Sequence, residues 1–411
     1  MSKKICILTQ SHLCRNPRVV KEANALAADG YDVSILTTFT YANLLEEDFK
    51  LIDSKHITYR GVVNMIAGEE SSYYRLKERF KRRFAGELIS RFGWEQAGAL
   101  GYDYHRNFRA ALKEKADLYI CHQEVSTVIG CKLIEKGFKV AFDFEDWYSH
   151  DLLPEANRSR PISLLEKSEK FALRNGVLTY TTSESLASAL AAFAETSKPK
   201  VLHNVFPLKE RDLMDGRLKD RQDLDKPSLH WYSQTIGPGR GLEFLIESLH
   251  EIEIPLDLHL RGNIFGSYDQ VLSDSFPVEK GHRIFFHPLV PHLELLSRIA
   301  EHDIGLAMEE YVPDSRNLTI TNKILQYLLA GIAVLATDTE GQKEVGCAAP
   351  DAVILFRNQQ KDDFVQSLNQ LLNDKQKLQF AKMKALEIAN EKYCWEKQAP
   401  MLVQWVHNVL N

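Results

Sequence analysis

Short apolar runs alternate with amphipathic segments along almost the whole chain. In the first half, these runs predict buried strands over residues 4–9, 33–37, 57–63, 118–121, 140–143 and 177–180. A helical pattern follows each of them. The first helix begins near Pro17 and stops before Gly30, and its apolar face consists of Val19, Val20, Ala23, Leu26 and Ala27. This alternation predicts a parallel sheet with helices on both faces.

The same rhythm restarts after residue 205, with strands expected over residues 230–233, 256–260, 284–286, 304–307, 334–337 and 352–356. The two series predict two α/β domains, residues 1–204 and 205–395, which suits a chain of 411 residues. Between the series lies the charged segment 206–228, which has few large apolar residues. Its composition is typical of a linker or a solvated helix.

Composition narrows the class of protein. A net charge of −5 argues against a generally basic nucleic-acid binder. The six cysteines contain no C-x-x-C pair, which favours reduced, partly buried thiols. No stretch reaches the ~20 apolar residues of a membrane span, and the opening apolar run is too short for a signal peptide. We therefore expect a soluble cytoplasmic protein.

A glycine-rich turn provides the first candidate site. In open parallel sheets, ligands bind beyond the carboxyl ends of the strands, and two such sheets facing each other would form a cleft. Gly237, Gly239 and Gly241 follow the strand at 230–233 and precede a helix, so backbone amides can approach an anion there. Arg240 adds a planar fork of donors suited to phosphate oxygens. The alternative is a plain tight turn with a surface arginine.

The second candidate is the loop and helix from Asn317 to Gly331. Thr319, Thr321 and Asn322 supply hydroxyl and amide groups, and Thr321 or Asn322 can cap the helix. Lys323 lies in the first helical turn, where a cation is electrostatically unfavourable. An anionic ligand would explain its presence, whereas the alternative is an ordinary capped surface helix.

Several segments together resemble the family 4 retaining glycosyltransferases. Residues 15–23 (RNPRVVKEA) and 26–33 are similar to that family's first strand–helix–strand unit. Residues 142–146 (FDFED) resemble its Tyr-Asp-Ala-His-Glu segment, and 239–243 (GRGLE) resemble its Arg-Gly-Leu-Glu turn. Residues 321–338 resemble its nucleotide-binding helix and following strand. The resemblance implies the GT-B fold, which has two facing Rossmann-like domains, an inter-domain cleft and a last helix, here 396–411, that crosses back to the first domain.

The resemblance also implies roles on the donor side. Arg240 matches the basic residue that grips the donor diphosphate, and Lys323 stands where a second phosphate contact is expected. Gln326 replaces a glutamate that usually bonds the nucleotide ribose. Gln234 stands where many relatives have a glycine or a second arginine. Thr319, Thr321, Asn322 and the turn glycines complete the donor-binding set.

On the acceptor side, Glu145 replaces the family's usual histidine, and Asp146 keeps an acid at the next position. Either carboxylate can orient or deprotonate an acceptor hydroxyl, or instead cap a helix or form a surface ion pair. His122 follows a strand near a position where the family often has a histidine, although a lone histidine is more often structural. Arg15 and Arg18 are expected on the same side.

Residues 73–92 (YYRLKERFKRRFAGELISRF) interleave basic with aromatic residues. Such a helix can lie peripherally on an anionic membrane surface, here the inner face. The alternative is a solvated helix whose aromatic residues pack inward.

Three functions are consistent with these observations. The first is a metal-independent glycosyltransferase that moves a sugar, with retention, from a nucleotide-sugar to a glycan or lipid-linked acceptor in surface polysaccharide or glycoconjugate synthesis. The second is a nucleotide-sugar-binding partner protein without activity, suggested by Gln234, Gln326 and Glu145. The third is a nicotinamide-dependent oxidoreductase, which is disfavoured because Arg261 stands where an acid would hold the ribose.

Overall fold

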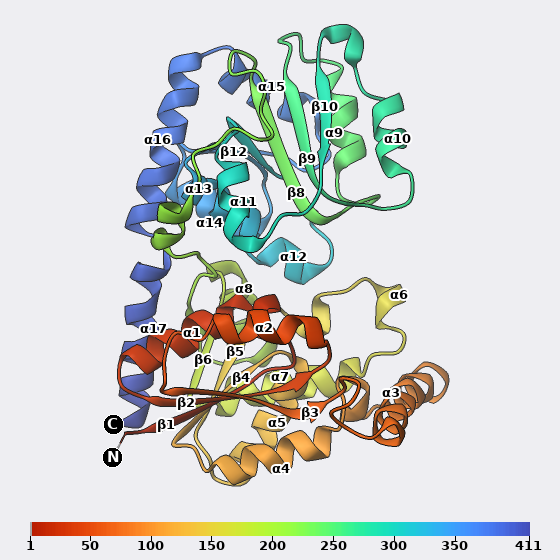
Figure 1. Ribbon diagram of the computed structural model, residues 1–411, viewed down its shortest axis with the longest axis vertical. Coiled ribbons are helices and arrows are strands. Elements are labelled where there is room, and N and C mark those ends of the chain that lie inside the picture. Colours follow the sequence, from red (N-terminus) through yellow and green to blue (C-terminus); the bar gives the residue numbers. More distant parts are fainter. Residues whose placement is uncertain (1) are drawn as a thin grey trace. The chain divides into compact units, whose positions relative to one another are not determined.

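The computed structural model describes residues 2–411, and the chain divides into two compact units. The N-terminal unit comprises Met1–Leu202 and Ala399–Asn411, and the C-terminal unit comprises His203–Gln398. Each unit contains one parallel sheet flanked by helices (Figure 1). The predicted α/β fold with two Rossmann-like sheets is confirmed, whereas a cleft shared by the domains stays a prediction.

The N-terminal sheet has the strand order β3-β2-β1-β4-β5-β6-β7. The strands are β1 Lys4–Leu8, β2 Asp32–Phe39, β3 Ile57–Asn64, β4 Leu118–His122, β5 Val140–Phe144, β6 Leu178–Thr181 and β7 Lys200–Val201. The helices of this unit are α1 Pro17–Ala28, α2 Ala42–Lys50, α3 Ser72–Phe92, α4 Tyr104–Glu114, α5 Glu124–Ile134, α6 Pro154–Asn157, α7 Ile162–Asn175 and α8 Glu184–Ala194. The chain's last helix is α17 Trp395–Leu410.

The C-terminal sheet has the strand order β10-β9-β8-β11-β12-β13. The strands are β8 Ser228–Ile236, β9 Asp257–Ile264, β10 Arg283–His287, β11 Ile304–Ala307, β12 Ala333–Thr337 and β13 Val353–Phe356. The helices are α9 Leu242–Leu249, α10 Tyr268–Asp274, α11 His292–Ile299, α12 Asp314–Leu318, α13 Asn322–Ala330, α14 Glu340–Ala348, α15 Lys361–Leu372 and α16 Lys375–Glu391. Two large apolar clusters form its core.

The strand order creates a switch point in each sheet. In the N-terminal sheet, the chain adds β2 and β3 on one side of β1 and then adds β4 on the other side. In the C-terminal sheet, it adds β9 and β10 on one side of β8 and then adds β11 on the other side. Ligands of open α/β sheets bind outside the carboxyl ends of the strands at this position. Ligand-binding residues are therefore expected in the segments that follow β1, β4 and β5, and in those that follow β8 and β11.

The charged segment 206–228 is not a free linker, contrary to expectation. The Arg221 side chain is almost fully buried, and its Nη2 lies 2.7 Å from Asp303 Oδ2. Arg298 Nη2 lies 2.6 Å from Asp215 Oδ1. Because its charges pair with buried partners of the C-terminal unit, the segment is fixed along that unit despite its polar composition.

The end of α17 belongs to the N-terminal unit. Lys139 Nζ donates to the Val409 carbonyl at 2.7 Å, and Lys200 Nζ lies 5.1 Å from the centre of the Trp405 ring. None of the helices within residues 2–411 combines the length and the apolar composition that a membrane span requires. The six cysteines are free thiols.

Candidate functional site

Lys323 and Glu309 form an ion pair at the carboxyl edge of the C-terminal sheet. Glu309 lies two residues beyond β11, and Lys323 is in the first turn of α13. Lys323 Nζ lies 2.5 Å from Glu309 Oε1, and the Thr321 hydroxyl donates to the same oxygen at 3.1 Å. Burial alone would raise the pKa of Glu309, but Lys323 beside it holds this pKa below its ordinary value. The Glu309 carboxylate therefore accounts for a lysine at this helix start, a partner that neither the anionic ligand nor the capped surface helix expected from the sequence includes.

Gln326 lies one helical turn after Lys323 on the same face of α13. The Gln326 side chain is buried, and its Oε1 accepts a hydrogen bond from the Tyr232 hydroxyl on β8. Lys323 Nζ lies 6.0 Å from the centre of the Trp231 ring. The neighbouring strand β8 thus supports both polar side chains of α13.

The glycine turn follows β8 and reaches the same edge of the sheet. Gly239 and Gly241 have φ of 72° and 76°, a conformation that favours glycine. A Cβ added at Gly241 would lie 3.4 Å from Met308 Cε and 3.8 Å from Glu310 Oε1, so the turn touches the loop after β11. Gly241 caps α9 without a side-chain bond, which leaves the first amides of the helix for a ligand.

The remaining donor-side candidates lie around this turn and loop. Arg240 is exposed, and within residues 2–411 its guanidinium makes no hydrogen bond or ion pair. Gln234 is an exposed residue of β8, which is longer than expected. Thr319 donates to the Ser315 carbonyl at 2.8 Å, and Asn322 Oδ1 accepts from Asn204 Nδ2 at 3.2 Å. Neither Thr321 nor Asn322 caps α13 through its side chain, contrary to expectation, because Thr321 bonds Glu309 instead.

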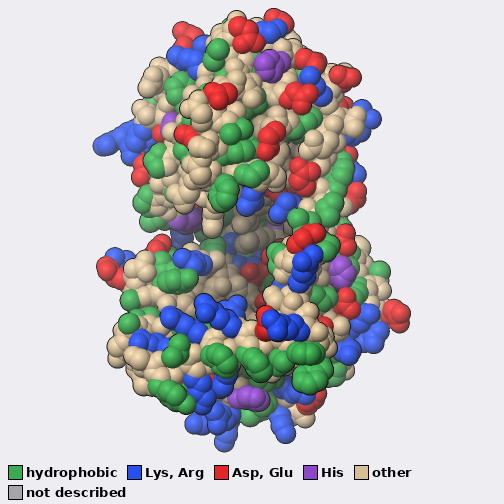
Figure 2. All heavy atoms as spheres, turned by 90° about the vertical axis from the view of Figure 1, so that its right-hand side faces the viewer, with side chains coloured by type: hydrophobic (Ala, Val, Ile, Leu, Met, Phe, Trp, Pro, Cys, Tyr) green, Lys and Arg blue, Asp and Glu red, His purple; other side chains and the backbone are tan. Residues whose placement is uncertain are grey.

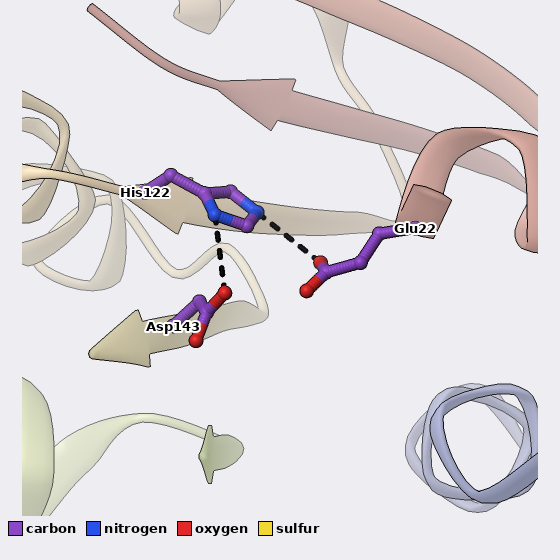
Figure 3. A group of neighbouring side chains, drawn as sticks. All are labelled: Glu22, His122 and Asp143. Atoms are coloured by element: carbon purple, nitrogen blue, oxygen red, sulfur yellow. Dashed lines mark ion pairs between the residues drawn. The ribbon is translucent and has the colours of Figure 1, made fainter. Parts of the chain in front are cut away.

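A buried ion-pair network lies at the carboxyl ends of β4 and β5 in the N-terminal unit; Figure 3 shows three of its members, Glu22, His122 and Asp143. His122 ends β4 and is fully buried; its Nε2 lies 3.2 Å from Glu22 Oε2, and its Nδ1 lies 3.2 Å from Asp143 Oδ2. Arg18 Nη2 donates to Asp143 Oδ1 at 2.9 Å, and Arg18 Nε lies 3.5 Å from Glu22 Oε1. The Tyr180 hydroxyl donates to Glu22 Oε2 at 2.7 Å.

The charges of this network hold His122 as a cation. Burial would lower the pKa of His122, but Glu22 and the bonded acids Asp143 and Glu145 raise it well above its ordinary value. Burial raises the pKa of Asp143, but Arg18 and His122 outweigh burial and lower it to about 2. Glu22, His122 and Asp143 offer three ligand atoms within 4.8 Å of one another. Because the Arg18 guanidinium already contacts both carboxylates, the geometry is that of an ion-pair cluster.

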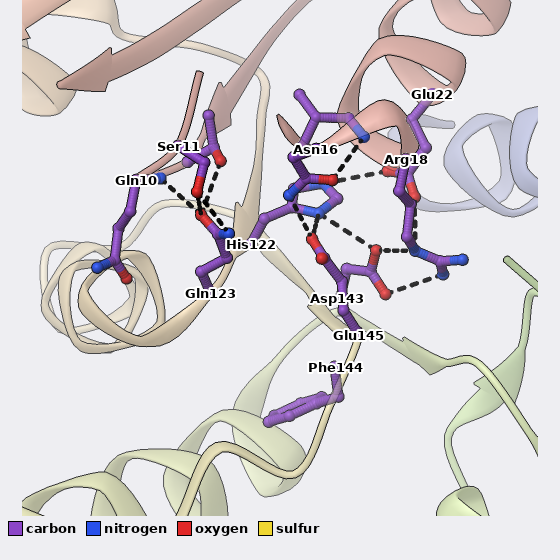
Figure 4. A network of polar contacts seen from close by, with 12 residues as sticks. Gln10, Ser11, Asn16, Arg18, Glu22, His122, Gln123, Asp143, Phe144 and Glu145 are labelled. Atoms are coloured by element: carbon purple, nitrogen blue, oxygen red, sulfur yellow. Dashed lines mark hydrogen bonds and ion pairs between the residues drawn. The ribbon is translucent and has the colours of Figure 1, made fainter. Parts of the chain in front are cut away.

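Glu145 connects this buried network to the surface (Figure 4). Its Oε1 accepts from Asn16 Nδ2 at 2.9 Å and lies 2.9 Å from His122 Nδ1. Asp146 is exposed. Arg15 is exposed above the Tyr41 ring, with its Cζ 4.8 Å from the ring centre. Arg18 is 1% exposed, so this candidate for the acceptor side serves the ion-pair network instead.

Sequence reasoning assigned no role to Asn16, Glu22, Gln123 or Glu309, although all four take part in these networks. Gln123 follows β4 with φ of 68°, a strained conformation for a residue other than glycine. Its Oε1 accepts from the Thr9 hydroxyl at 3.0 Å and from the Gln10 amide at 2.9 Å. Two of these residues could have been found from their positions in the sequence. Gln123 comes one residue after β4 and Glu309 two residues after β11, where ligand-binding residues of parallel sheets are expected.

Taken together, the two parallel sheets and their switch points define the GT-B fold class. The sequence matches no protein-family model and no curated protein. Among solved structures, sucrose-phosphate synthase from Thermosynechococcus elongatus is similar at a TM-score of 0.72, with 16% identity over 99% of both chains. HepE from Anabaena in complex with UDP has a TM-score of 0.65, with 17% identity over 99% of both chains. WaaG, a glycosyltransferase involved in lipopolysaccharide biosynthesis, has a TM-score of 0.61 and 13% identity, covering 97% of this chain and 99% of its own.

Proposed function

We propose that this protein is a glycosyltransferase that moves a sugar from a nucleoside diphosphate sugar to a hydroxyl group, with retention of configuration and without a metal. The observation that carries this proposal is the unpaired Arg240 on a positive-φ glycine turn, at the same sheet edge as Lys323. Solved structures of this fold contain such ligands, since HepE is described in complex with UDP and with UDP-glucose.

Different residues of the C-terminal unit bind the diphosphate and the ribose of the donor. Arg240 and the amides of the turn 237–241 bind the diphosphate, and Lys323 contributes the two ammonium hydrogens that Glu309 leaves unused. Because the Oε1 of Gln326 accepts from Tyr232, its amide nitrogen is the group that meets a ribose hydroxyl. Fixed donors of this kind stabilise the departing diphosphate, and each typically contributes ~10²–10³ in rate.

The acceptor side includes a membrane-facing helix, α3. The face of α3 exposes Tyr73, Leu76, Phe80 and Phe84, each more than half accessible, so the alternative in which the aromatic residues pack inward is wrong. Figure 2 shows hydrophobic side chains gathered in a row, with Lys and Arg side chains beside them, on the face that carries α3. The helix carries seven basic and two acidic residues. Arginines 79, 82 and 83 line one groove with Arg160.

An apolar row flanked by cations fits an anionic lipid surface, because the rings enter the interface while the guanidinium groups contact phosphate. The acceptor class that suits such a surface is a glycan or a lipid-linked sugar of a surface polysaccharide or glycoconjugate. Flotation with vesicles containing anionic lipid at physiological salt tests this contact. Protein that stays in the bottom fraction of the gradient with anionic as well as with neutral vesicles would contradict it.

The nicotinamide alternative finds no support in the C-terminal sheet. Strand β9 continues past Arg261 to Ile264, and Arg261 is buried and paired with Asp220. Residues 261–266 (RGNIFG) contain no carboxylate that could hold a ribose.

A thermal-shift panel of UDP, GDP, ADP and NAD tests the proposed function. One nucleoside diphosphate should raise the melting temperature of the protein, and NAD should not, because only the former matches the turn and α13. Hydrolysis or transfer of the corresponding nucleotide-sugar then separates an active enzyme from a binding partner without activity. Stabilisation by NAD alone would overturn the proposal.

A further inference from the structure

The two carboxylate oxygens of Glu145 have different surroundings. Oε1 is fixed from two sides, by Asn16 Nδ2 and by His122 Nδ1, each at 2.9 Å. Within residues 2–411, Oε2 makes no hydrogen bond or ion pair, and it is not among the buried polar atoms. The side chain is 18% exposed. One oxygen is therefore anchored, and the other is accessible and unpaired.

The anchor itself is held rigidly. His122 lies between Glu22 on its Nε2 side and the acids Asp143 and Glu145 on its Nδ1 side, so both ring nitrogens face carboxylates. Arg18 Nη2 donates to Asp143 Oδ1. The side chains of Arg18, Glu22, His122 and Asp143 are each at most 1% exposed. Asn16 is also buried, and its side-chain oxygen caps α1 by accepting from the Val19 backbone amide. The position of Glu145 Oε1 is therefore set by two buried donors.

We propose that Asn16 and His122 are positioning residues, which fix Glu145 Oε1 so that Oε2 accepts a hydrogen bond from a hydroxyl group on the sugar of the nucleotide-sugar donor. This inference rests on the proposed function. A carboxylate oxygen accepts from hydroxyls and repels anions, so a neutral polyhydroxylated sugar ring, rather than a phosphate or a uronate carboxylate, lies against it.

The substitution Glu145→Gln has a specific consequence under this proposal. Asn16 and His122 both donate, so the amide oxygen of the new side chain takes the place of Oε1 and its NH₂ group points outward. The variant then presents a donor where the native residue presents an acceptor. The expected loss in kcat/KM is about 10- to 100-fold, the range for a hydrogen bond to a charged group, and E145A should lose as much.

Two variants of His122 separate its two faces. The amide nitrogen of asparagine occupies the place of histidine Nδ1, whereas that of glutamine occupies the place of Nε2. H122N therefore keeps a donor toward Glu145, and H122Q keeps a donor toward Glu22 only. We expect H122N to retain roughly tenfold more kcat/KM than H122Q, because only H122N still anchors Glu145. A merely structural histidine would give no such order.

Asn16 provides a second test that leaves His122 intact. N16S keeps a hydroxyl that can cap α1 but loses the amide donor to Glu145. N24S is the matched control, since Asn24 lies on the same helix and its Nδ2 donates to the Leu51 carbonyl at 3.0 Å. The expected result is a loss of roughly tenfold for N16S and no loss for N24S.

The readout is kcat/KM for the nucleotide-sugar that the wild-type protein turns over in the panel, beginning with UDP-glucose, and for its monodeoxy analogues. For the wild-type enzyme, one monodeoxy analogue should have a lower kcat/KM than the parent donor. E145Q should show no such difference for that analogue, because the substitution and the missing hydroxyl group remove the same hydrogen bond. E145Q activity within twofold of wild type, equal activities of H122N and H122Q, or equal losses for every analogue would overturn the inference alone. A wild-type protein that binds no nucleoside diphosphate and turns over no nucleotide-sugar would instead overturn the proposed function, and this inference with it.

Discussion

A stack of buried histidines should make the C-terminal unit sensitive to acid. The ring centres of His230 and His302 lie 4.6 Å apart, and those of His259 and His302 lie 4.5 Å apart. All three side chains are fully buried, and no described residue from 2 to 411 forms a hydrogen bond with either ring nitrogen of His230. Burial lowers the pKa of His259 to about 3 and lowers the pKa values of His230 and His302 well below the ordinary range. Arg261 disfavours the charged form of His230 further.

The direction of the pH dependence follows from these lowered pKa values. Below the ordinary histidine pKa of about 6.5, the unfolded chain takes up protons that the folded unit does not. Stability is therefore complete above pH 6.5 and decreases as the pH falls. His259, whose pKa is lowered to about 3, costs about 1.4 kcal/mol per pH unit below 6.5, or about 2 kcal/mol at pH 5. His230 and His302 add to this loss in the same direction, so the total is a sizeable part of the ~5–15 kcal/mol by which domains are stable.

Hydrogen exchange of core amides measures this loss within one unit. The opening free energy of the Leu229 and Leu258 amides, both in the core of the C-terminal sheet, should fall between pH 7.5 and pH 5.0. His230→Phe keeps an aromatic ring and sacrifices no hydrogen bond within residues 2–411, so it should make that fall smaller. His250→Gln is the control, because His250 lies in the same unit and is exposed. A stability that does not change with pH, or an H230F variant with the wild-type pH dependence, would show that these histidines do not cause the acid sensitivity.

Three further predictions concern the sites. Lys323→Met should destabilise the C-terminal unit by about 3–5 kcal/mol, because it leaves Glu309 unpaired in a largely buried position. The double variant K323M/E309Q should recover most of that stability in urea melts but not nucleotide binding; recovery of both would exclude Lys323 from the donor site. Gly241→Ala should cost about 1–2 kcal/mol, because φ is 76°, and should weaken nucleoside diphosphate binding in a titration, whereas unchanged affinity would place the ligand elsewhere. Phe80→Glu should abolish flotation with anionic vesicles while leaving the melting temperature within a degree or two, since Phe80 is exposed; flotation equal to wild type would contradict the α3 contact.

The sheets were predictable from sequence because their strands are buried apolar runs. Strand β7 was missed because it has only two residues, and β8 proved longer because Thr235 and Ile236 pair with Asn263 and Ile264 across a register shift. No hydrophobic pattern marks that extension, since Gln234 within it is polar and exposed.

The partners within each site were harder to predict. Lys323 was recognisable because a cation at a helix start is unfavourable, but its partner Glu309 lies fourteen residues away, beyond a different strand. Asn16 and Glu145 are 129 residues apart and meet only because parallel strands bring their carboxyl ends to one edge. Helix α3 was predicted, but its pattern did not decide whether the aromatic residues face inward, since polar and apolar residues alternate around it.

We propose that a nucleoside diphosphate binds the glycine turn through the guanidinium of Arg240. Comparison of sugar transfer by wild type and Arg240→Ala tests it most directly, because Arg240 is exposed and its loss should leave the fold intact. We expect the transfer rate to fall by about 10²–10³ while the melting temperature without ligand is unchanged. Transfer by the variant at close to the wild-type rate would contradict it.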